Sequence, residues 1–457
     1  MSLKIAVIGA GPAGYPAALT AAKLGAEVTV VEKALAGGVC LHSGCIPSKS
    51  LLDAAHRFDA VRDIAALCQP TAATAAEEIL KALDWPKIQK RQQLVSQKLA
   101  AGILAMFRQA KIQYIEGVAS FKDAHSLHIT QKDQSQELSF DSVIIAAGST
   151  AFVPPPFDKI KDRVYDNSTI FQIPQLPKRL VIVGGGAIGC EFATLMSSLG
   201  VEVHLVEMQP RLLPNMDEAV SRLIAQSLQK HGVTLWLGKS VTDAHTEADK
   251  AVLTLDQSGT LEAEAVLVAI GRQCNLADLH LENIGLEWNR KGIVGVNPRT
   301  LQVKDHIYAA GDVTGLALLA HAGTRQGVVA AHNMCGKSQT YHNEWVPNAV
   351  YTVPEVAGVG LTRAQAQAQG LEVKAQKVFM LANGRALTMA AAEGFVEIIS
   401  DKNTGRLLGA TLAGPNASEI ISAFTVALQA GFTAEQLQQV IFPHPTVSEA
   451  IGDALVR

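Results

Sequence analysis

The first regular hydrophobic pattern lies at the beginning of the chain. Residues 3–8 form a short apolar run, and residues 9–14 read Gly-Ala-Gly-Pro-Ala-Gly. The positions up to about residue 24 have helical spacing, and a second apolar run at residues 28–31 ends at Glu32. A short apolar run bounded by glycine is typical of a buried strand, so this order predicts a strand–turn–helix–strand unit.

The same order returns far downstream. Residues 180–183 form an apolar run, the turn at 184–189 reads Gly-Gly-Gly-Ala-Ile-Gly, and a helix is expected to end near residue 199. The next apolar run, at residues 203–206, ends at Glu207. The interval from the first glycine to the glutamate is the same in both units. We therefore predict two βαβ nucleotide-binding units in one chain.

The remaining segments follow other patterns. Apolar strands that end at Gly148 and Gly271 close the two halves. Apolar residues recur with helical spacing beyond Pro86, which predicts a long amphipathic helix, whereas the Ala/Thr-rich residues 72–78 carry little information. Residues 341–457 have no third glycine fingerprint and alternate apolar strands with helices, an α+β pattern suited to an interface domain.

Length and charge narrow the class of protein. The chain has 457 residues, which predicts roughly two to four domains of about 100–200 residues each. Its formal net charge is -3 and it has no basic run, which argues against nucleic-acid binding. No stretch reaches the ~18 apolar residues that a membrane-spanning helix needs, and the first residues have no signal-peptide pattern. We therefore expect a cytoplasmic protein.

The two glycine turns have the spacing that binds dinucleotides. The first glycine allows a tight turn, the second lets the backbone approach a pyrophosphate, and the third lets helix and strand pack closely. The helix N-terminus then presents free N–H groups to the phosphates. Glu32 and Glu207 stand where an acidic side chain accepts hydrogen bonds from a ribose. At Glu207 this favours NAD over NADP, although Arg211 keeps open the alternative of a clamp for a 2′-phosphate.

Two of the six cysteines lie close together in the segment 37–49, Gly-Gly-Val-Cys-Leu-His-Ser-Gly-Cys-Ile-Pro-Ser-Lys. Gly44 allows the close approach of Cys40 and Cys45, and a helix that begins there would place its positive end near the sulfurs and stabilise a thiolate. Lys49 adds a cation one turn further along. Zinc is a weaker alternative because the other cysteines are scattered singly, and a pair of inert buried thiols is another. We therefore expect a redox-active pair and no metal.

Three motifs together resemble those of the flavoprotein disulfide reductases and, within them, the dihydrolipoyl dehydrogenases. The cysteine segment is similar to the signature GGxCxxxGCxPSK of the active disulfide. Residues 307–313, Ile-Tyr-Ala-Ala-Gly-Asp-Val, resemble the second FAD motif, whose aspartate is here Asp312. Residues 444–449, His-Pro-Thr-Val-Ser-Glu, resemble the C-terminal pair of histidine and glutamate. The similarity covers essentially the whole chain.

The resemblance implies an α/β fold with two Rossmann-like dinucleotide-binding domains, for FAD and for NAD, and a C-terminal α+β dimerisation domain. The FAD-binding domain would comprise residues 1–150 and 274–340, the NAD-binding domain residues 151–273, and the dimerisation domain residues 341–457. A homodimer is implied as well. The partners would be dihydrolipoamide or the lipoyl domains of a 2-oxo acid dehydrogenase or glycine cleavage complex.

The resemblance also assigns roles to individual residues. The catalytic ones would be the redox disulfide, an ion pair beside the flavin, and a base from the other subunit with its orienting carboxylate, namely Cys40 and Cys45, Lys49 and Glu191, and His444 and Glu449. A cis bond between His444 and Pro445 is implied too. Besides Lys49 and Glu191, the implied cofactor-binding residues are Gly9, Gly11, Pro12, Ala13, Gly14, Glu32, Lys33, Gly38, Val39, Gly117, Ala147, Gly148, Gly184, Gly186, Ala187, Ile188, Gly189, Glu207, Gly271, Arg272, Gly311, Asp312, Leu319 and Ala320.

The implied reaction is the oxidation of dihydrolipoamide to lipoamide through the two cysteines and FAD, with hydride transfer to NAD⁺. An NAD(P)H-dependent reductase of another small disulfide or of a quinone is the alternative. Departures from the usual pattern are Val39, His42, Pro16, Pro443 and Ala187, and they leave the disulfide substrate open. His42 is expected to face solvent in a loop, with tuning of a thiolate as the alternative.

Overall fold

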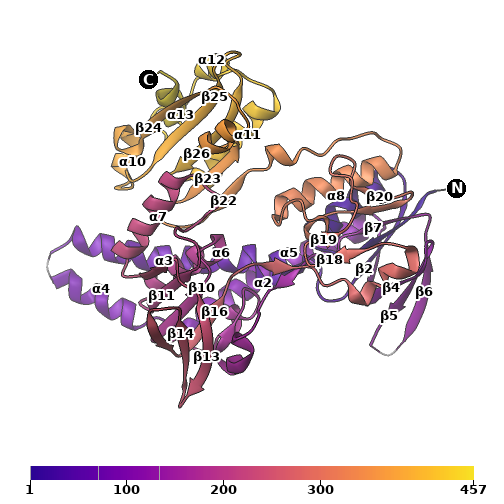
Figure 1. Ribbon diagram of the computed structural model, residues 1–457, viewed down its shortest axis with the longest axis horizontal. Helices are drawn as coiled ribbons and strands as arrows, with labels where there is room; N and C mark the ends of the chain where they lie inside the picture. Colours follow the sequence, from indigo (N-terminus) through magenta and orange to yellow (C-terminus); the bar gives the residue numbers. More distant parts are fainter. Residues whose placement is uncertain (1, 70, 133, 457) are drawn as a thin grey trace.

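The computed structural model describes residues 2–69, 71–132 and 134–456. Three large sheets form its main layers, and helices cover them (Figure 1). Within the described residues, no helix combines the length and the apolar character needed to cross a membrane. The architecture is the predicted α/β fold, with two parallel sheets that follow the two glycine turns and an α+β unit at the C-terminal end.

The first sheet has six strands in the order β20-β21-β7-β1-β2-β3. Strands β1, β2, β3, β7 and β21 are parallel, and β20 is an antiparallel edge. The last two strands in the sequence come from a segment far downstream of the others. The bounds are β1 (Lys4–Ile8), β2 (Glu27–Glu32), β3 (Gln113–Glu116), β7 (Ser142–Ile145), β20 (Gln302–Lys304) and β21 (Ile307–Ala309), with helices α1 (Gly14–Lys23) and α8 (Ala320–Met334) packed against each other beside it.

The second sheet has five parallel strands in the order β12-β11-β10-β16-β9. Strands β10 and β11 pair as β1 and β2 do in the first sheet: Ile182 lies opposite Leu205, and Val7 lies opposite Val30. The predicted second βαβ unit is therefore confirmed. The bounds are β9 (Val164–Tyr165), β10 (Arg179–Val183), β11 (Glu202–Glu207), β12 (Thr234–Leu237) and β16 (Ala265–Val268), with helices α6 (Ala187–Ser198) and α7 (Glu218–Lys230).

The third sheet is antiparallel and has the order β22-β23-β26-β25-β24. Figure 1 shows it as a separate layer above the rest of the chain. This confirms the α+β pattern predicted for the C-terminal part. The bounds are β22 (Asn348–Val350), β23 (Val356–Gly360), β24 (Val373–Phe379), β25 (Phe395–Asp401) and β26 (Leu407–Ala413), with helices α9 (Arg363–Ala368), α10 (Gly384–Thr388), α11 (Ala417–Gln429), α12 (Ala434–Gln438) and α13 (Glu449–Val456).

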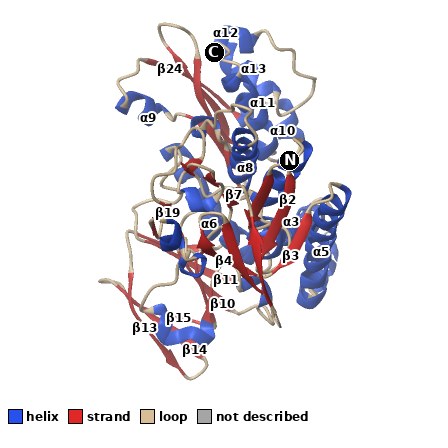
Figure 2. Cartoon of the chain, turned by 90° about the vertical axis from the view of Figure 1, so that its right-hand side faces the viewer, coloured by secondary structure: helices blue, strands red, loops and turns tan. Residues whose placement is uncertain are grey.

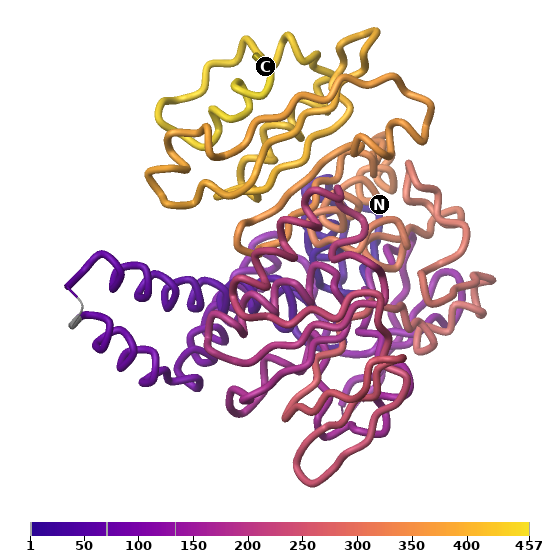
Figure 3. Tube along the Cα trace, turned by 60° about the vertical axis from the view of Figure 1, so that its left-hand side comes forward, coloured from indigo at the N-terminus to yellow at the C-terminus, as the bar shows by residue number. Residues whose placement is uncertain are grey.

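Four helices between β2 and β3 link the first sheet to the second. They are α2 (Gly38–Ser43), α3 (Cys45–Ala66), α4 (Thr71–Lys81) and α5 (Trp85–Gln109). Helix α3 packs against both α5 and α6, so it joins the cysteine segment to the second sheet. The outer half of α3 and α4 project from the body of the molecule (Figure 3). The long helix predicted beyond Pro86 is confirmed as α5, and the uninformative Ala/Thr-rich residues form α4.

Shorter elements fill the connections between these layers, and Figure 2 shows small sheets beside the large ones. The strands of the small sheets are β4 (Val118–Asp123), β5 (Ser126–Thr130), β6 (Ser135–Ser139), β8 (Thr150–Ala151), β13 (Val241–Glu247), β14 (Lys250–Leu255), β15 (Gly259–Ala263), β17 (Arg272–Gln273), β18 (Trp288–Asn289) and β19 (Gly292–Ile293). The antiparallel pair β8 and β17 lies at the two crossings between the first and second sheets.

Pro16, a departure from the usual pattern, lies at the third position of α1. The first-turn N–H groups of a helix have no acceptor within the helix, so a proline there removes no intrahelical hydrogen bond. The position of the residue therefore explains why the helix tolerates it.

Candidate active site

One continuous cavity of about 1140 Å³ is bordered by the glycine turns of both parallel sheets and by the cysteine segment. These turns follow the carboxyl ends of β1 and β10, where open α/β sheets bind their ligands. The predicted residues on the cavity wall are Gly9, Gly11, Pro12, Ala13, Glu32, Lys33, Gly38, Val39, Cys40, Cys45, Lys49, Gly117, Ala147, Gly148, Gly184, Gly186, Ala187, Ile188, Glu191, Glu207, Gly271, Arg272, Gly311, Asp312, Leu319 and Ala320.

Two buried carboxylates hold the glycine turns in matching ways. Glu32 accepts the backbone N–H of Ala10 at 2.7 Å, and Glu207 accepts that of Gly185 at 2.6 Å. The second oxygen of each carboxylate accepts the N–H of the residue two positions after the glutamate, at 2.9 Å for Glu32 and 2.7 Å for Glu207. Both carboxylates therefore fix the turn while lining the cavity, and their contact with a ribose stays a prediction.

The third glycine of each turn lies behind the cavity wall. A Cβ added at Gly14 would lie 1.8 Å from the carbonyl oxygen of Gly9, and one added at Gly189 would lie 1.8 Å from that of Gly184. These positions bring helix and strand into contact, as the motif predicts. Their part in cofactor binding is therefore indirect, through the shape of the turn.

Arg211, the candidate clamp for a 2′-phosphate, is engaged within its own loop. Its guanidinium donates to the carbonyl oxygen of Pro214 at 2.6 Å and to that of Met216 at 3.1 Å. Those bonds hold the loop that follows β11. The side chain that stands at the end of β11 and lines the cavity is Glu207, which carries a negative charge.

The two cysteines flank a break between helices. Cys40 lies in α2 and Cys45 is the first residue of α3, so the Cys45 sulfur stands at a helix N-terminus. Gly44 joins the helices, and a Cβ there would lie 2.9 Å from the carbonyl oxygen of Val39. Both thiols are free in this structure.

Hydrogen bonding between the thiols separates their acidities. The bond from Cys40, together with the nearby Lys49 ammonium, lowers the pKa of Cys45 to about 7 although burial opposes this. The same bond, with burial, raises the pKa of Cys40. In the reduced state Cys45 is thus the sulfur that carries the negative charge first.

Lys49 and Glu191 form the predicted ion pair. The Lys49 ammonium lies 2.8 Å from both carboxylate oxygens of Glu191. Glu191 comes from α6 of the second sheet and its side chain is only 8% exposed, whereas that of Lys49 is 32% exposed. A third residue contacts the pair, since the backbone N–H of Tyr351 donates to Glu191 at 3.1 Å.

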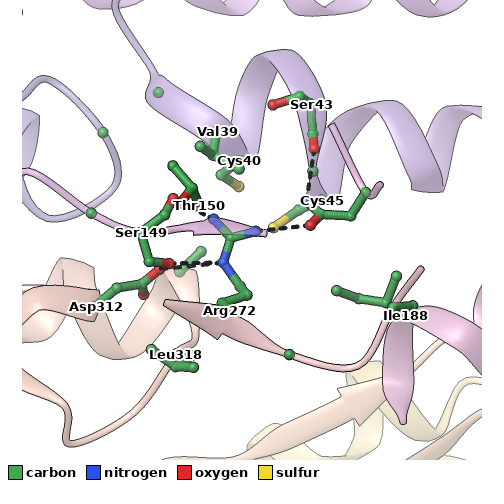
Figure 4. A pocket seen from close by; sticks show the side chains of 18 of the residues that line it. Val39, Cys40, Ser43, Cys45, Ser149, Thr150, Ile188, Arg272, Asp312 and Leu318 are labelled. Atoms are coloured by element: carbon green, nitrogen blue, oxygen red, sulfur yellow. Dashed lines mark hydrogen bonds and ion pairs between the residues drawn. The ribbon is translucent and has the colours of Figure 1, made fainter. Parts of the chain in front are cut away.

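Arg272, one of the implied cofactor-binding residues, is the centre of a polar network with Ser149 and Asn167, which the sequence motifs did not indicate. Figure 4 shows its guanidinium with Ser149 and Asp312 to one side and Cys45 to the other. It donates to the Ser149 hydroxyl at 2.8 Å and to the Ser149 carbonyl oxygen at 2.6 Å. The Ser149 hydroxyl in turn donates to Asp312. Ser149 could have been suspected, because it directly follows Gly148, one of the implied cofactor-binding residues.

Asn167 extends this network to the cysteine segment. Its side chain accepts from Arg272 at 3.1 Å and donates to the carbonyl oxygen of Ser43 at 3.4 Å. It is only 6% exposed. Asn167 stands in a stretch of sequence without a recognisable motif, so its place beside the cysteines follows only from the fold.

His444 and Glu449 are brought together, but away from the cavity. The Nδ1 atom of His444 donates to Glu449 at 2.8 Å, and the other carboxylate oxygen accepts the N–H of Thr446 at 2.8 Å. The Thr446 bond and then the His444 bond lower the pKa of Glu449. The His444 side chain is 82% exposed, and its peptide bond to Pro445 is cis. Within one chain the histidine therefore lies at the surface, outside the wall that holds the cysteines.

Two further histidines are bound to backbone. His42 lies in α2, not in a loop as expected, and its Nε2 atom donates to the carbonyl oxygen of Ala36 at 2.9 Å. His321 donates in the same way to Pro347 at 2.6 Å. Across residues 2–69, 71–132 and 134–456, no group of three or more histidine, cysteine and carboxylate side chains is arranged to hold a metal ion.

Both glycine turns border the cavity, so its wall offers a place for a dinucleotide at each turn. Its volume of about 1140 Å³ exceeds the roughly 300–1,000 Å³ of a pocket for one small molecule. A Cβ added at Gly148 or Gly186 would point into open space among the described residues, so the backbone there is accessible to a ligand. Where the first turn meets the cysteine segment, a Cβ at Gly38 would lie 2.9 Å from the Gly11 Cα. Glycine is therefore needed to keep both walls this close.

Comparisons with known proteins agree with this geometry. Residues 3–327 match the family described as pyridine nucleotide-disulphide oxidoreductase, and residues 346–455 match its dimerisation domain. A dihydrolipoyl dehydrogenase of Bacillus subtilis (strain 168) is 35% identical over 452 residues, which cover 98% of this chain and 94% of the relative. A second one from the same organism is 36% identical over 459 residues, covering 99% and 98%.

Solved structures of the same class superpose over nearly the whole chain. LpdA from Mycobacterium tuberculosis has a TM-score of 0.91 at 27% identity and covers 99% of both chains. The HOCl-induced flavoprotein disulfide reductase RclA from Escherichia coli, as the Cu(II) complex of its C43S mutant, has a TM-score of 0.88 at 28% identity, covering 100% of this chain and 99% of that chain. This chain therefore belongs to the pyridine nucleotide-disulphide oxidoreductase family, whose members use FAD and NAD.

Proposed function

We propose that this protein is a dihydrolipoyl dehydrogenase, which oxidises free or protein-bound dihydrolipoamide and reduces NAD⁺. The observation that carries the proposal is the cysteine pair on the wall of the shared cavity, with Cys45 favoured as a thiolate near neutral pH beside Lys49. The full-length relatives with that name support the choice of substrate. Lipoyl domains of a 2-oxo acid dehydrogenase or glycine cleavage complex would be its partners.

The cysteines would react with the substrate in two successive thiol–disulfide exchanges. One substrate thiol loses its proton to a base and attacks Cys40 in the oxidised Cys40–Cys45 disulfide, and Cys45 leaves as a thiolate. The second substrate thiol then attacks the mixed disulfide, which releases lipoamide and leaves Cys40 reduced. Bound FAD would accept the electron pair of the reduced cysteines, and bound NAD⁺ would carry it away as hydride.

We assign the base to His444 of the partner subunit in a homodimer. Within one chain His444 is exposed and outside the cavity, and the C-terminal part matches a dimerisation domain. Its Nδ1 atom donates to Glu449, which leaves Nε2 free to accept the substrate proton. Glu449 is itself fixed by the Thr446 N–H, so the ring is held in one orientation.

The remaining assignments follow from the same cavity. We propose NAD rather than NADP, because Glu207 lines the cavity while Arg211 is engaged with the loop carbonyls. A carboxylate at this position suits a free 2′-hydroxyl and repels a phosphate. We also propose the domain division 1–150 with 274–340, 151–273 and 341–457, which is supported by the membership of strands in the three large sheets. The protein would act in the cytoplasm.

A second candidate is an NAD(P)H-dependent reductase of another small disulfide or of a quinone. The similarity to RclA, a flavoprotein disulfide reductase, favours it. In that case electrons would run in the opposite direction through the same cysteines.

Steady-state rates decide between the two functions. We expect dihydrolipoamide with NAD⁺ to give a higher kcat/KM than NADH or NADPH with other small disulfides or quinones. Cys45→Ser should abolish lipoamide turnover while the protein still binds FAD. Normal turnover in that variant would exclude the disulfide mechanism, and faster reduction of another disulfide by NADPH would favour the second candidate.

A further inference from the structure

Tyr351 contacts both members of the Lys49–Glu191 ion pair, although it belongs to a different part of the chain. It directly follows β22, the first strand of the third sheet. Its backbone N–H donates to Glu191 at 3.1 Å, and its ring lies beneath the Lys49 ammonium, 4.5 Å from Nζ to the ring centroid. The third sheet therefore begins beside the ion pair of the candidate active site.

The two contacts of Tyr351 hold the ion pair in different ways. Its N–H fixes the buried Glu191 carboxylate, and this contact does not depend on the side chain. Its ring faces Lys49, whose side chain is 32% exposed and has a long flexible stem. A cation over an aromatic face is held by the negative face of the ring. The ring thus confines an ammonium that could otherwise turn towards solvent.

We propose that Tyr351 is a positioning residue whose ring holds the Lys49 ammonium at the point from which its charge acts on the Cys45 sulfur. The inference rests on the role of Cys45 in the proposed function. Removal of the ring by substitution keeps Glu191, the backbone N–H of residue 351 that binds it, and both cysteines. What changes is the place of one positive charge.

The charges around Cys45 give the direction of the effect. The Lys49 ammonium lowers the pKa of Cys45, whereas the Glu191 carboxylate raises it. If the ammonium moves towards solvent, the favourable charge weakens while the carboxylate stays. The pKa of Cys45 should then rise, and its thiolate should become scarcer at pH 7.

The test compares Tyr351→Leu with Tyr351→Phe in the full-length reduced protein. The thiolate of Cys45 is followed across pH by its ultraviolet absorbance, as the difference from the same protein carrying Cys45→Ser. We expect Tyr351→Leu to lower the thiolate fraction at pH 7 roughly two- to threefold, and Tyr351→Phe to match the wild type because it keeps the ring. Tyr351→Met is the second variant without a ring, should the leucine variant fail to fold.

A double-mutant cycle separates positioning from a merely structural role. Lys49→Met removes the charge, so Tyr351→Leu should cause no further change in that background. Phe395→Leu is a matched control, because Lys377 lies 3.9 Å from the Phe395 ring centroid and pairs with Glu397 in the third sheet. It should leave the Cys45 titration unchanged.

Three results would overturn the proposal. They are a wild-type titration in Tyr351→Leu, an equal change in Tyr351→Phe, and a change that persists when Lys49 is absent. Since neither dihydrolipoamide nor NAD⁺ is present in the measurement, its outcome is independent of whether the protein turns over the proposed substrate.

Discussion

At the scale of single residues, the glutamates that end β2 and β11 serve the backbone as well as a ligand. Each carboxylate accepts one N–H from its own glycine turn and one from the residue two positions after the glutamate, at distances between 2.6 and 2.9 Å. Hydrogen bonds to a charged acceptor are the stronger kind, so the turn is held rigidly before a dinucleotide arrives. A substitution there alters the turn and the recognition of the ribose together.

Glu207→Gln should weaken the preference for NAD over NADP. The amide keeps the shape but loses the negative charge and one acceptor oxygen, so we expect the ratio of kcat/KM for NAD⁺ to that for NADP⁺ to fall about tenfold or more. Glu202→Gln, an exposed position at the start of the same strand, is the control and should not change the ratio. An unchanged ratio in Glu207→Gln would remove the assignment of this carboxylate to the ribose.

The acidity of Cys45 depends on its neighbour Cys40. Because the Cys40 hydrogen bond is the largest cause of the lowered pKa, Cys40→Ala should move the Cys45 titration from about pH 7 towards the ordinary range of thiols near pH 8.5. Below that midpoint the thiolate is lost, so the variant should contain little thiolate at pH 7. Ultraviolet titration of the reduced proteins measures this, and a midpoint that stays near pH 7 would contradict the role of the hydrogen bond.

At the scale of elements, each glycine turn is a packing device and a binding device at once. The third glycine lets the helix contact the strand, and the second leaves room beside the backbone. These functions fall on different residues of one motif. They can therefore be separated by substitution.

Gly189→Ala and Gly186→Ala form a matched pair in the second turn. The first places a Cβ 1.8 Å from a backbone oxygen, and we expect it to lower the free energy of unfolding by about 3 kcal/mol. The Cβ added by Gly186→Ala points into open space, so this substitution should change the free energy of unfolding by less than about 0.5 kcal/mol. It should instead raise the KM for NAD⁺ by crowding the pyrophosphate. Thermal unfolding and steady-state kinetics give both quantities, and equal stabilities would refute the distinction.

The sequence was most informative where a function is contained in one element. The glycine turns, the cysteine segment and the pairing of His444 with Glu449 lie within short runs, so their spacing predicts their local geometry. Arg272 was predicted as a cofactor-binding residue, but its network with Ser149 and Asn167 was not predicted, because the three residues come from separate segments that only the packed fold brings together. The expected loop around His42 was wrong for a local reason, since the residues between the cysteines form the short helix α2.

At the scale of the whole molecule, one chain contains the cysteines and the histidine but keeps them apart. Cys40 and Cys45 line the central cavity, whereas His444 is exposed on the C-terminal unit. A site assembled from two copies would reconcile these positions. Symmetry would then create two equivalent sites in each dimer.

Mixing two inactive variants tests this arrangement. Homodimers of Cys45→Ser lack the redox pair, and those of His444→Gln lack the base. After unfolding and refolding together, half of the dimers should be mixed and one of their two sites complete, which gives roughly a quarter of the wild-type activity. Each variant refolded alone is the control. If the mixture is no more active than its parts, the histidine acts within its own chain.

The first sheet is built from two segments that are far apart in the sequence, and this affects how the protein folds during synthesis. Strands β20 and β21 complete a sheet whose other strands emerge from the ribosome much earlier, whereas β9 to β16 of the second sheet are made without interruption. Domains generally fold as units during synthesis, starting from the N-terminus. Here the order is reversed, because all strands of the second sheet have been synthesised before β21, which pairs with β7 in the first sheet. A growing chain halted after β16 should therefore resist proteases in its later half and remain open in its earlier one.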